Sequence, residues 1–286
     1  MFVIISMLQK DFHNHATLEM LKNITDMTWT PAIPKKFVGM SEQSIRRMLL
    51  QNNNTINYEK SYLTGDAPDS FSWLETASEC MEVRDQGVCG SSWAFSAVGS
   101  FSDNRCINKL DQQRIQYSEQ YMVSCDTENQ GCAGGQLTWD QCFMQFPGVP
   151  KNSCISYKSG TTGVSGKCPT TCDDKSPITL YQSKVFEDIS VSEESIKIGV
   201  TQGTLQTAFT VYTDFMYYIE GIYQHKSGSV EGGHAVSIVG YGEENGLKYW
   251  LVRNSWGTTW GENGYFRIVR GQNECGIEDR CFLTSV

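Results

Sequence analysis

Several features are absent from the sequence, and each absence excludes a class of protein. No run of about 18 consecutive apolar residues occurs, so the sequence predicts no membrane-spanning helix. Glycine and proline number 26 and 7 among 286 residues, and 12% are aromatic, which excludes collagen and an intrinsically disordered chain. Apolar residues make up 40%, enough for a hydrophobic core. At roughly 150 residues per domain, the length suggests two units or one larger enzyme with an extra segment.

Basic residues are the minority among the charged residues. There are 23 of them against 32 acidic residues, a net charge of −9, so nucleic acid is not an expected partner. Residues 1–65 carry seven basic and five acidic groups, whereas residues 66–286 carry 16 and 27. A turn-forming sequence, Gly65-Asp-Ala-Pro68, lies at the boundary. The sequence therefore predicts a basic leader, residues 1–65, that associates with an acidic body, residues 66–286.

Cysteine is absent before Cys80, yet eleven cysteines lie from there onward. This number is typical of a disulfide-bonded protein in an oxidising compartment, which predicts the secretory pathway: a lysosome-like vesicle or secretion. Zinc is the competing interpretation, but Cys168 and Cys172 lack a second pair of ligands at the usual spacing, so we expect no metal. Residues 1–8 are apolar without a basic flank, and are either the remnant of a signal or an ordinary terminal strand.

The spacing of apolar residues changes along the body. Residues 91–101 have helical spacing, and weaker helical patterns continue to about residue 145. Segments with strand composition follow at residues 234–240, 249–253 and 264–269. The sequence therefore predicts an α+β fold, with a helical half at roughly residues 80–177 and an antiparallel strand half at roughly residues 178–286.

Three shorter segments have a local signal. In the leader, residues 41–50 are predicted as a helix that starts with a serine, and residues 51–55 as a loop. In the body, residues 154–172 are rich in glycine, serine, threonine and proline. We expect this last segment to be a loop held by disulfides rather than a packed element.

Five short motifs carry residues with the chemistry of a peptidase. Ser92 lies in Cys-Gly-Ser-Ser-Trp, and Gln86 stands six positions before it. His234 lies in Gly-Gly-His-Ala, and Asn254 lies in Asn-Ser-Trp-Gly, 142 and 162 residues after Ser92. Residues 131–135 read Gly-Cys-Ala-Gly-Gly. In this order the motifs resemble those of the papain-like cysteine peptidases, whose signature has cysteine where this chain has serine.

The resemblance covers nearly the whole chain and implies a papain-like two-domain fold with the cleft between the halves. Residues 209–215 and 275–278 resemble cathepsin B, and the leader resembles its short propeptide. A propeptide of this kind lies along the cleft backwards relative to substrate and blocks the site without being cut. Protonation of carboxylates at low pH is expected to weaken its hold on the acidic body.

The resemblance implies a role for each motif residue. A thiolate at position 92 would lie at a helix N-terminus beside the His234 imidazolium, and both favour the anion. Asn254 would accept a hydrogen bond from the far ring nitrogen of His234 and fix its tautomer. The Gln86 side chain and the N–H of residue 92 would bind the oxyanion. Trp256 would shield the contact between asparagine and histidine from water.

Serine at position 92 changes this chemistry. Its hydroxyl is far less acidic than a thiol, so a preformed ion pair with His234 is not possible, and we expect no useful peptidase activity. Two explanations remain open: an experimental Cys→Ser change in a zymogen, or a natural homologue that binds peptides without cleaving them. A serine hydrolase using Ser92 is weaker, because Asn254 cannot stabilise an imidazolium as a carboxylate would.

Specificity is also predicted from the resemblance. Cathepsin B releases dipeptides through two histidines on an occluding loop, but no histidine lies within residues 154–168, so we expect an endopeptidase. Arg280 stands where cathepsin B has a glutamate on the floor of the S2 pocket. It either disfavours basic P2 residues or turns outward and leaves an apolar pocket. The substrate-binding residues implied are Gly134, Gly135, Gln136, Leu137, Ala208, Ala235, Trp256 and Arg280.

The resemblance further implies a set of disulfides and partners. The implied bridges are Cys89–Cys132, Cys80–Cys106, Cys125–Cys168 and Cys154–Cys172. Cys142, Cys275 and Cys281 remain, either as one further bridge and a thiol or as three thiols. No cofactor is expected. The expected partners are protein and peptide substrates, the leader as an intramolecular inhibitor, and cystatin-type inhibitors, with the chain itself a monomer.

Overall fold

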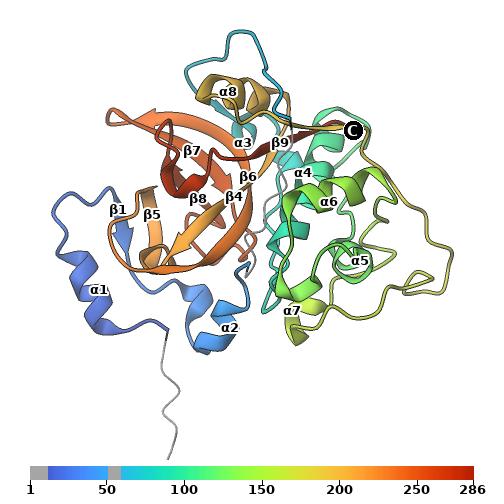
Figure 1. Ribbon diagram of the computed structural model, residues 1–286, viewed down its shortest axis with the longest axis horizontal. Coiled ribbons are helices and arrows are strands. Elements are labelled where there is room, and N and C mark those ends of the chain that lie inside the picture. The colour runs from blue at the N-terminus through green and yellow to red at the C-terminus, as the bar shows by residue number, and fades with distance from the viewer. Residues whose placement is uncertain (1–11, 51–58) are drawn as a thin grey trace, which may run out of the picture.

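A computed structural model describes residues 12–50 and 59–286 (Figure 1). The apolar run at residues 1–8 and the predicted loop at 51–55 lie outside the described residues. The helices are α1 His15–Lys22, α2 Glu42–Arg46, α3 Trp73–Thr76, α4 Ser92–Ile107, α5 Glu119–Cys125, α6 Leu137–Gln145, α7 Ser159–Thr162 and α8 Glu193–Gln202. The strands are β1 Trp29–Pro31, β2 Phe71–Ser72, β3 Phe186–Asp188, β4 Leu205–Tyr212, β5 Tyr218–Tyr223, β6 Val230–Glu244, β7 Leu247–Arg253, β8 Tyr265–Val269 and β9 Cys281–Thr284.

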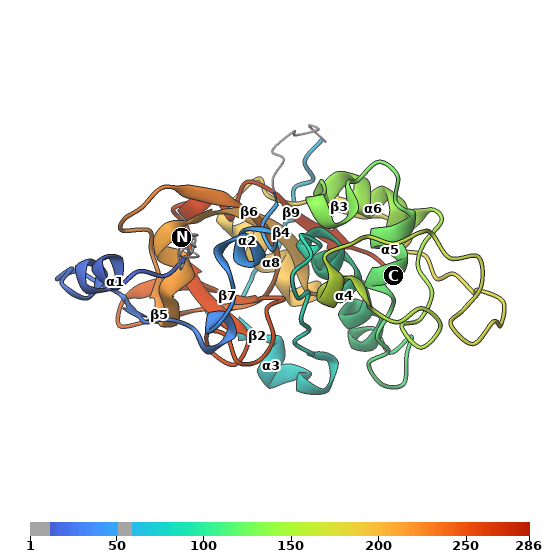
Figure 2. The same ribbon diagram turned by 90° about the horizontal axis from the view of Figure 1, so that it is seen from below.

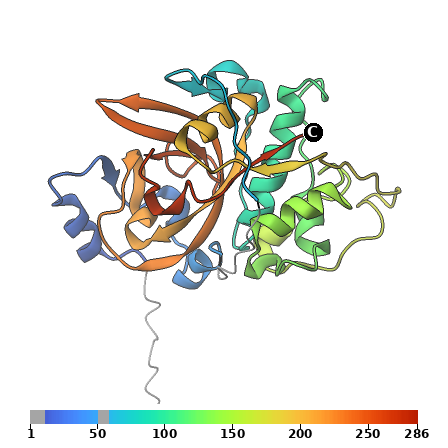
Figure 3. The same cartoon turned by 45° about the horizontal axis from the view of Figure 1, so that its top comes forward.

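The predicted α+β fold is confirmed, with helices and strands gathered on different sides of the molecule. Helices α4 to α7 lie on the right in Figure 1 and the curved sheet on the left, a separation that is also clear in Figure 3. The strands form one sheet in the order β1-β5-β8-β7-β6-β4-β9-β3, and β2 pairs with β6. All three predicted strand segments fall within or overlap β6, β7 and β8.

One strand pair departs from the expected antiparallel sheet. β5 pairs with β8 in parallel, while the other paired strands are antiparallel. Both edges of β4 are already taken by β6 and β9. β5 therefore cannot return beside its sequence neighbour, and it pairs at the far side of the sheet, where β8 runs in the same direction.

Helix α4 is the central element of the helical half. It was predicted from residues 91–101, and it extends to Ile107. Almost every residue of α4 is buried, because α5 and α6 pack on one side of it and β6 and β4 on the other. Small residues such as Ala94, Ala97 and Gly99 allow this close approach on all sides. The N-terminus of α4 therefore lies at the junction of the two halves.

The described part of the leader packs mainly on the strand half. β1 extends the sheet by pairing with β5, and Trp29 and Phe37 join the core of the strand half. The leader helix predicted at residues 41–50 is shorter than expected, since α2 ends at Arg46. In Figures 1 and 2, α2 lies close to the line where the strands meet the helical half.

The loop at residues 154–172 is mostly irregular, as predicted, with only the short helix α7 within it. The four implied disulfides are present: Cys80–Cys106, Cys89–Cys132, Cys125–Cys168 and Cys154–Cys172. Cys275 and Cys281 are both thiols, so no further bridge joins them. Within residues 12–50 and 59–286, no helix has the length and apolar character to cross a bilayer.

Candidate active site

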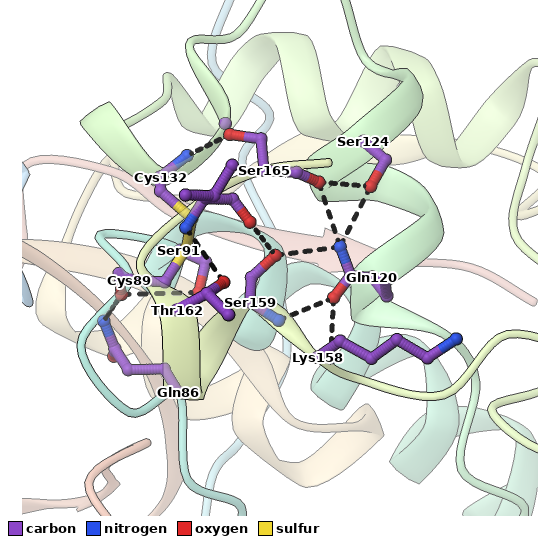
Figure 4. Close-up of a disulfide and its surroundings, with 12 residues drawn as sticks. Gln86, Cys89, Ser91, Gln120, Ser124, Cys132, Lys158, Ser159, Thr162 and Ser165 are labelled. Carbon is purple, nitrogen blue, oxygen red and sulfur yellow. Dashed lines mark hydrogen bonds between the residues drawn. A yellow bond between two sulfur atoms is a disulfide. The ribbon is translucent and has the colours of Figure 1, made fainter. Parts of the chain in front are cut away.

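Ser92 is the first residue of α4 and is fully buried. The disulfide between Cys89 and Cys132 fixes the turn that leads into the helix, with an S–S distance of 2.04 Å (Figure 4). The Oγ atom of Ser92 accepts a hydrogen bond from the backbone N–H of Ala235, with an Oγ–N distance of 3.2 Å. The start of α4 therefore meets β6 directly beside His234, and the helix dipole favours negative charge at this point.

His234 and Asn254 come together from neighbouring strands. The Nε2 atom of His234 lies 2.7 Å from Oδ1 of Asn254, and the same oxygen accepts the backbone N–H of Ser255 at 2.7 Å. Because Oδ1 of Asn254 can only accept, these contacts place the ring proton of His234 on Nε2. The Nδ1 atom is buried and has no hydrogen-bond partner among the described residues. The second ring nitrogen of His234 is therefore available for acid–base chemistry.

The environment of His234 is apolar. The ring of Trp256 lies with its centroid 4.5 Å from that of His234, and both side chains are fully buried. Phe37 of the leader packs edge-on against Trp256 at 5.4 Å. Burial lowers the pKa of His234 to about 4, only partly opposed by the hydrogen bond to Asn254. The imidazole is therefore neutral near neutral pH in this form of the protein.

Gln86 is fully buried, and its side-chain amide is held in one orientation. Its Oε1 atom accepts a hydrogen bond from the Ser255 hydroxyl at 2.6 Å. Its Nε2 atom then donates to the carbonyl oxygens of Cys89, at 2.8 Å, and of Met48 in the leader, at 2.9 Å (Figure 4 shows the contact with Cys89). The amide that the motif assigns to oxyanion binding is therefore occupied by a peptide carbonyl of the leader.

The leader continues across both halves beyond Met48. Leu50 and Gly233 exchange two backbone hydrogen bonds, with N–O distances of 2.7 and 3.0 Å. The leader passes so close to Gly90 that a Cβ atom there would lie 2.8 Å from the carbonyl oxygen of Arg47. Gly233, directly before His234, and Gly90, two residues before Ser92, are thus both covered by leader backbone.

A cavity of about 220 Å³ lies beside this bridge. It brings together five predicted substrate-binding residues, namely Gly135, Gln136, Leu137, Ala208 and Arg280. Leu50 of the leader also lines it, and its side chain is 5% exposed. The other lining residues were not predicted: Phe209, Thr210, Gly233, Cys275, Gly276 and Asp279.

The remaining predicted substrate-binding residues lie outside this cavity. Gly134 lines a neighbouring depression formed with Trp139. Ala235 contacts Ser92 through its backbone, and Trp256 packs on His234. Ser255 was also not singled out, although it stands between the predicted Asn254 and Trp256. Its position in the Asn-Ser-Trp-Gly motif was the available signal for its role.

The loop that carries α7 is tied to the helical half by a polar network. The Gln120 side chain accepts the backbone N–H groups of Lys158 and Ser159, at 2.8 and 2.9 Å, and donates to the Ser159 hydroxyl at 2.9 Å (Figure 4). The Ser165 hydroxyl accepts the N–H of Cys132 at 2.9 Å. This network fixes the loop beside the Cys89–Cys132 disulfide and therefore beside the start of α4.

Comparison with known proteins identifies relatives along nearly the full length of the chain. The family model "Papain family cysteine protease" matches residues 67–284. Cathepsin B-like CP3 of Giardia intestinalis is 46% identical over 261 residues, which cover 88% of this chain and 87% of that protein. Cathepsin B-like CP2 of the same organism is 42% identical over 264 residues, covering 89% and 88%.

Solved structures give the same result. ProCathepsin B S9 from Trypanosoma congolense superposes with a TM-score of 0.88 at 28% identity, covering 96% of this chain and 98% of that one. The recombinant stem bromelain precursor superposes with a TM-score of 0.77 at 25% identity, covering 96% and 90%. The chain therefore belongs to the papain family of cysteine proteases and is similar to its cathepsin B-like members.

Proposed function

We propose that this chain is the zymogen of a cathepsin B-like cysteine endopeptidase, with Ser92 at the nucleophile position and no useful peptidase activity of its own. One observation carries the proposal. The side-chain amide of Gln86 donates to a peptide carbonyl, that of Met48, within the same buried site that holds Ser92 and the His234–Asn254 pair. A site that already binds a peptide carbonyl in this way is suited to acyl transfer.

With a thiol at position 92, the residues have complementary roles. The thiolate would attack the scissile carbonyl carbon, and the carbonyl oxygen would become an oxyanion bound by the Gln86 amide and the N–H of residue 92. Protonated Nδ1 of His234 would then give its proton to the leaving amine as the C–N bond breaks. Water, deprotonated by the same nitrogen, would hydrolyse the acyl-enzyme.

Serine in place of the thiol removes the first step. A buried neutral imidazole does not ionise a hydroxyl in the resting state, and Asn254 offers no negative charge to support an imidazolium. The Ser92 hydroxyl accepts a hydrogen bond from the backbone of Ala235. This contact also fits the alternative that the chain is a natural non-catalytic homologue that binds peptides.

We further propose that residues 1–65 are an inhibitory propeptide and residues 66–286 the peptidase domain. The leader occupies the Gln86 donor site with Met48 and forms part of the wall of the neighbouring cavity with Leu50, so its backbone stands where a substrate would bind. We place the protein in the secretory pathway, in a lysosome-like vesicle or secreted, because four disulfides form and persist in an oxidising compartment. Cystatin-type inhibitors fit the cleft once the leader is released, and the chain acts as a monomer.

The test is to compare three proteins with the leader removed: the Ser92 chain, Ser92→Cys, and Ser92→Ala as the matched control. We expect Ser92→Cys to cleave peptide substrates at least about 10³-fold faster than the other two, because the nucleophile is the least replaceable member of such a site. It should also be labelled by an epoxide reagent for thiols. A Ser92→Cys protein that neither cleaves nor is labelled would favour the peptide-binding homologue. Hydrolysis by the Ser92 chain that is lost in Ser92→Ala would favour a serine hydrolase.

A further inference from the structure

A second, smaller cavity lies beside the site, between α4, residues 235–237 within β6 and the end of β7. Its volume is about 20 Å³, and a single water-sized occupant needs roughly 10–15 Å³. Its lining includes Arg253 and Asn254 at the end of β7, Gly99 of α4, and Arg84 and Arg114. Gly99 is needed here, because a Cβ atom would lie 2.9 Å from Nη2 of Arg253.

Several side chains that line this cavity have a buried N–H donor without a partner. These donors are Nη1 of Arg253, Nδ2 of Asn254 and Nη2 of Arg114; none has a hydrogen bond within residues 12–50 and 59–286. The side chains of Arg253 and Arg114 are only 5% and 4% exposed. An unsatisfied donor at this depth is costly, so several around one small cavity indicate a shared acceptor.

Other nitrogens of these arginines are already paired. Nη2 of Arg253 and Nε of Arg114 contact the two oxygens of the fully buried Asp103, at 2.7 and 2.9 Å. Nη1 of Arg114 donates to Glu82 at 2.7 Å, and Nε of Arg84 lies 3.4 Å from Glu119. These nitrogens are therefore already engaged by carboxylates, whereas Nη1 of Arg253 and Nη2 of Arg114 are not.

The charged groups around the cavity balance one another. Arg84, Arg114 and Arg253 are paired with Glu119, Glu82 and Asp103. The two partly exposed groups, Arg84 at 27% and Glu82 at 46%, have opposite charges. An occupant is therefore selected by the unpartnered donors and not by an excess of charge.

We propose that this cavity binds a single chloride ion. A water molecule would need acceptors for its own hydrogens, whereas every unpartnered atom in the lining is a donor. A monatomic anion accepts from all of them and has no hydrogen of its own to place. The more exposed Glu82 and Arg84 mark the side from which the ion enters.

The ion has a consequence for the candidate active site. Asn254 presents Oδ1 to His234, so its Nδ2 group must point away from the imidazole. A chloride ion that accepts the Nδ2 protons makes this orientation of the amide the favourable one. The consequence rests on the proposed function, but ion binding does not, and it is measured without any activity assay.

The test uses the full Ser92 chain, crystallised in bromide in place of chloride. We expect an anomalous difference peak for bromide in contact with Nη1 of Arg253 and Nδ2 of Asn254. A featureless anomalous map, with the density of an ordinary water at that position, overturns the proposal.

A solution experiment separates this site from general salt effects. We expect the melting temperature to rise by roughly 3 °C or more when chloride replaces gluconate at constant ionic strength. Arg253→Lys keeps a cation for Asp103 but lacks the Nη1 donor that faces the ion. The melting temperature of this variant should therefore not respond to chloride. Arg270→Lys is the matched control, since Arg270 is equally buried but does not line the cavity. An unchanged chloride response in Arg253→Lys contradicts the proposal, and if that variant does not fold, the bromide result decides alone.

Discussion

At the scale of single residues, His234 links the candidate site to pH. Its pKa falls from an ordinary 6.5 to about 4 in the folded protein, because the ring is fully buried against Trp256. Between these two values the unfolded chain binds a proton that the folded protein does not. Folding stability attributable to His234 is therefore fully present above pH 6.5 and is lost as the pH falls toward 4.

We expect the free energy of unfolding of the Ser92 chain to fall by about 3 kcal/mol from this source between pH 7 and pH 4, at 1.36 kcal/mol per pKa unit. Denaturant unfolding at several pH values measures it. In a His234→Gln variant, the free energy of unfolding should fall by about 3 kcal/mol less over the same pH range. His15 is exposed, so a His15→Gln variant should behave like the unaltered chain. Identical pH profiles for both variants would mean that His234 is not held neutral.

We propose that substrate preference at P2 depends on Arg280. It lines the same cavity as Leu50 of the leader, so an apolar side chain fits there and a second cation meets a like charge. For the Ser92→Cys protein without its leader, we expect kcat/KM to be at least about tenfold higher for P2 leucine than for P2 arginine, a difference of about 1.4 kcal/mol. Arg280→Glu should raise kcat/KM for the substrate with arginine at P2. Equal rates for the two substrates in the unaltered pocket would place the guanidinium in solvent.

At the scale of elements, the sequence predicted the long and strongly patterned ones. The helix starting near Ser91 and the strands around His234 and Arg253 were confirmed, because their apolar spacing extends over several turns or residues. The leader helix ended four residues early, because the backbone of Met48 and Leu50 is bonded to Gln86 and Gly233 instead. Local propensity cannot anticipate such tertiary contacts.

Helix α8 was missed for a different reason. Its residues include Ile196, Ile198, Val200 and Thr201, which are β-branched and more typical of strands. Ser192 caps its N-terminus by accepting the N–H of Ser195, and the apolar side chains Ile196 and Val200 enter the core of the strand half. Burial of one face of the helix outweighs the strand preference of these residues, and Ser192 is the sequence signal for the helix start.

We propose that the loop at residues 154–172 sets the mode of cleavage. It lacks histidine, and its residues Thr162 to Ser165 line a cavity of about 1010 Å³ that Arg46 and Arg47 of the leader share. No histidine there can bind the carboxylate of a substrate C-terminus, so we expect the Ser92→Cys protein to cleave internal bonds. Peptides with a free C-terminus and their C-terminal amides should be cut at the same rate. Preferential release of C-terminal dipeptides from the free acids would contradict this prediction.

At the scale of the whole molecule, three ion pairs join the described part of the basic leader to the acidic body. Lys36 pairs with Asp85, Arg46 with Glu231, and Asp26 of the leader with Lys226 of the body, at 2.8 Å for the last. The hydrogen bond and charge of Lys226 lower the pKa of Asp26. This contribution is therefore present above the ordinary pKa of aspartate and is lost as the pH falls through the lowered value.

We expect removal of all three pairs, by Asp26→Asn, Lys36→Gln and Arg46→Gln together, to release the leader about tenfold more often, because each pair has one partner in solvent and contributes only modestly by itself. The measurement is the rate at which an added protease cuts the leader of the Ser92 chain at pH 6 in low salt. Lys22→Gln is the control, because Lys22 pairs with Glu19 inside the leader. High salt should reduce the difference. A triple variant cut no faster than the control would mean that apolar contacts alone retain the leader.

The disulfides are distributed unevenly over the molecule. All four lie between Cys80 and Cys172, and the strand half contains only the thiols Cys275 and Cys281. A reductant therefore acts on one side of the protein only: it would relax the turn before α4 and the loop around α7, while the sheet that carries His234 keeps its hydrogen bonds. Loss of the site under reduction would begin at position 92, with the histidine and asparagine still in register.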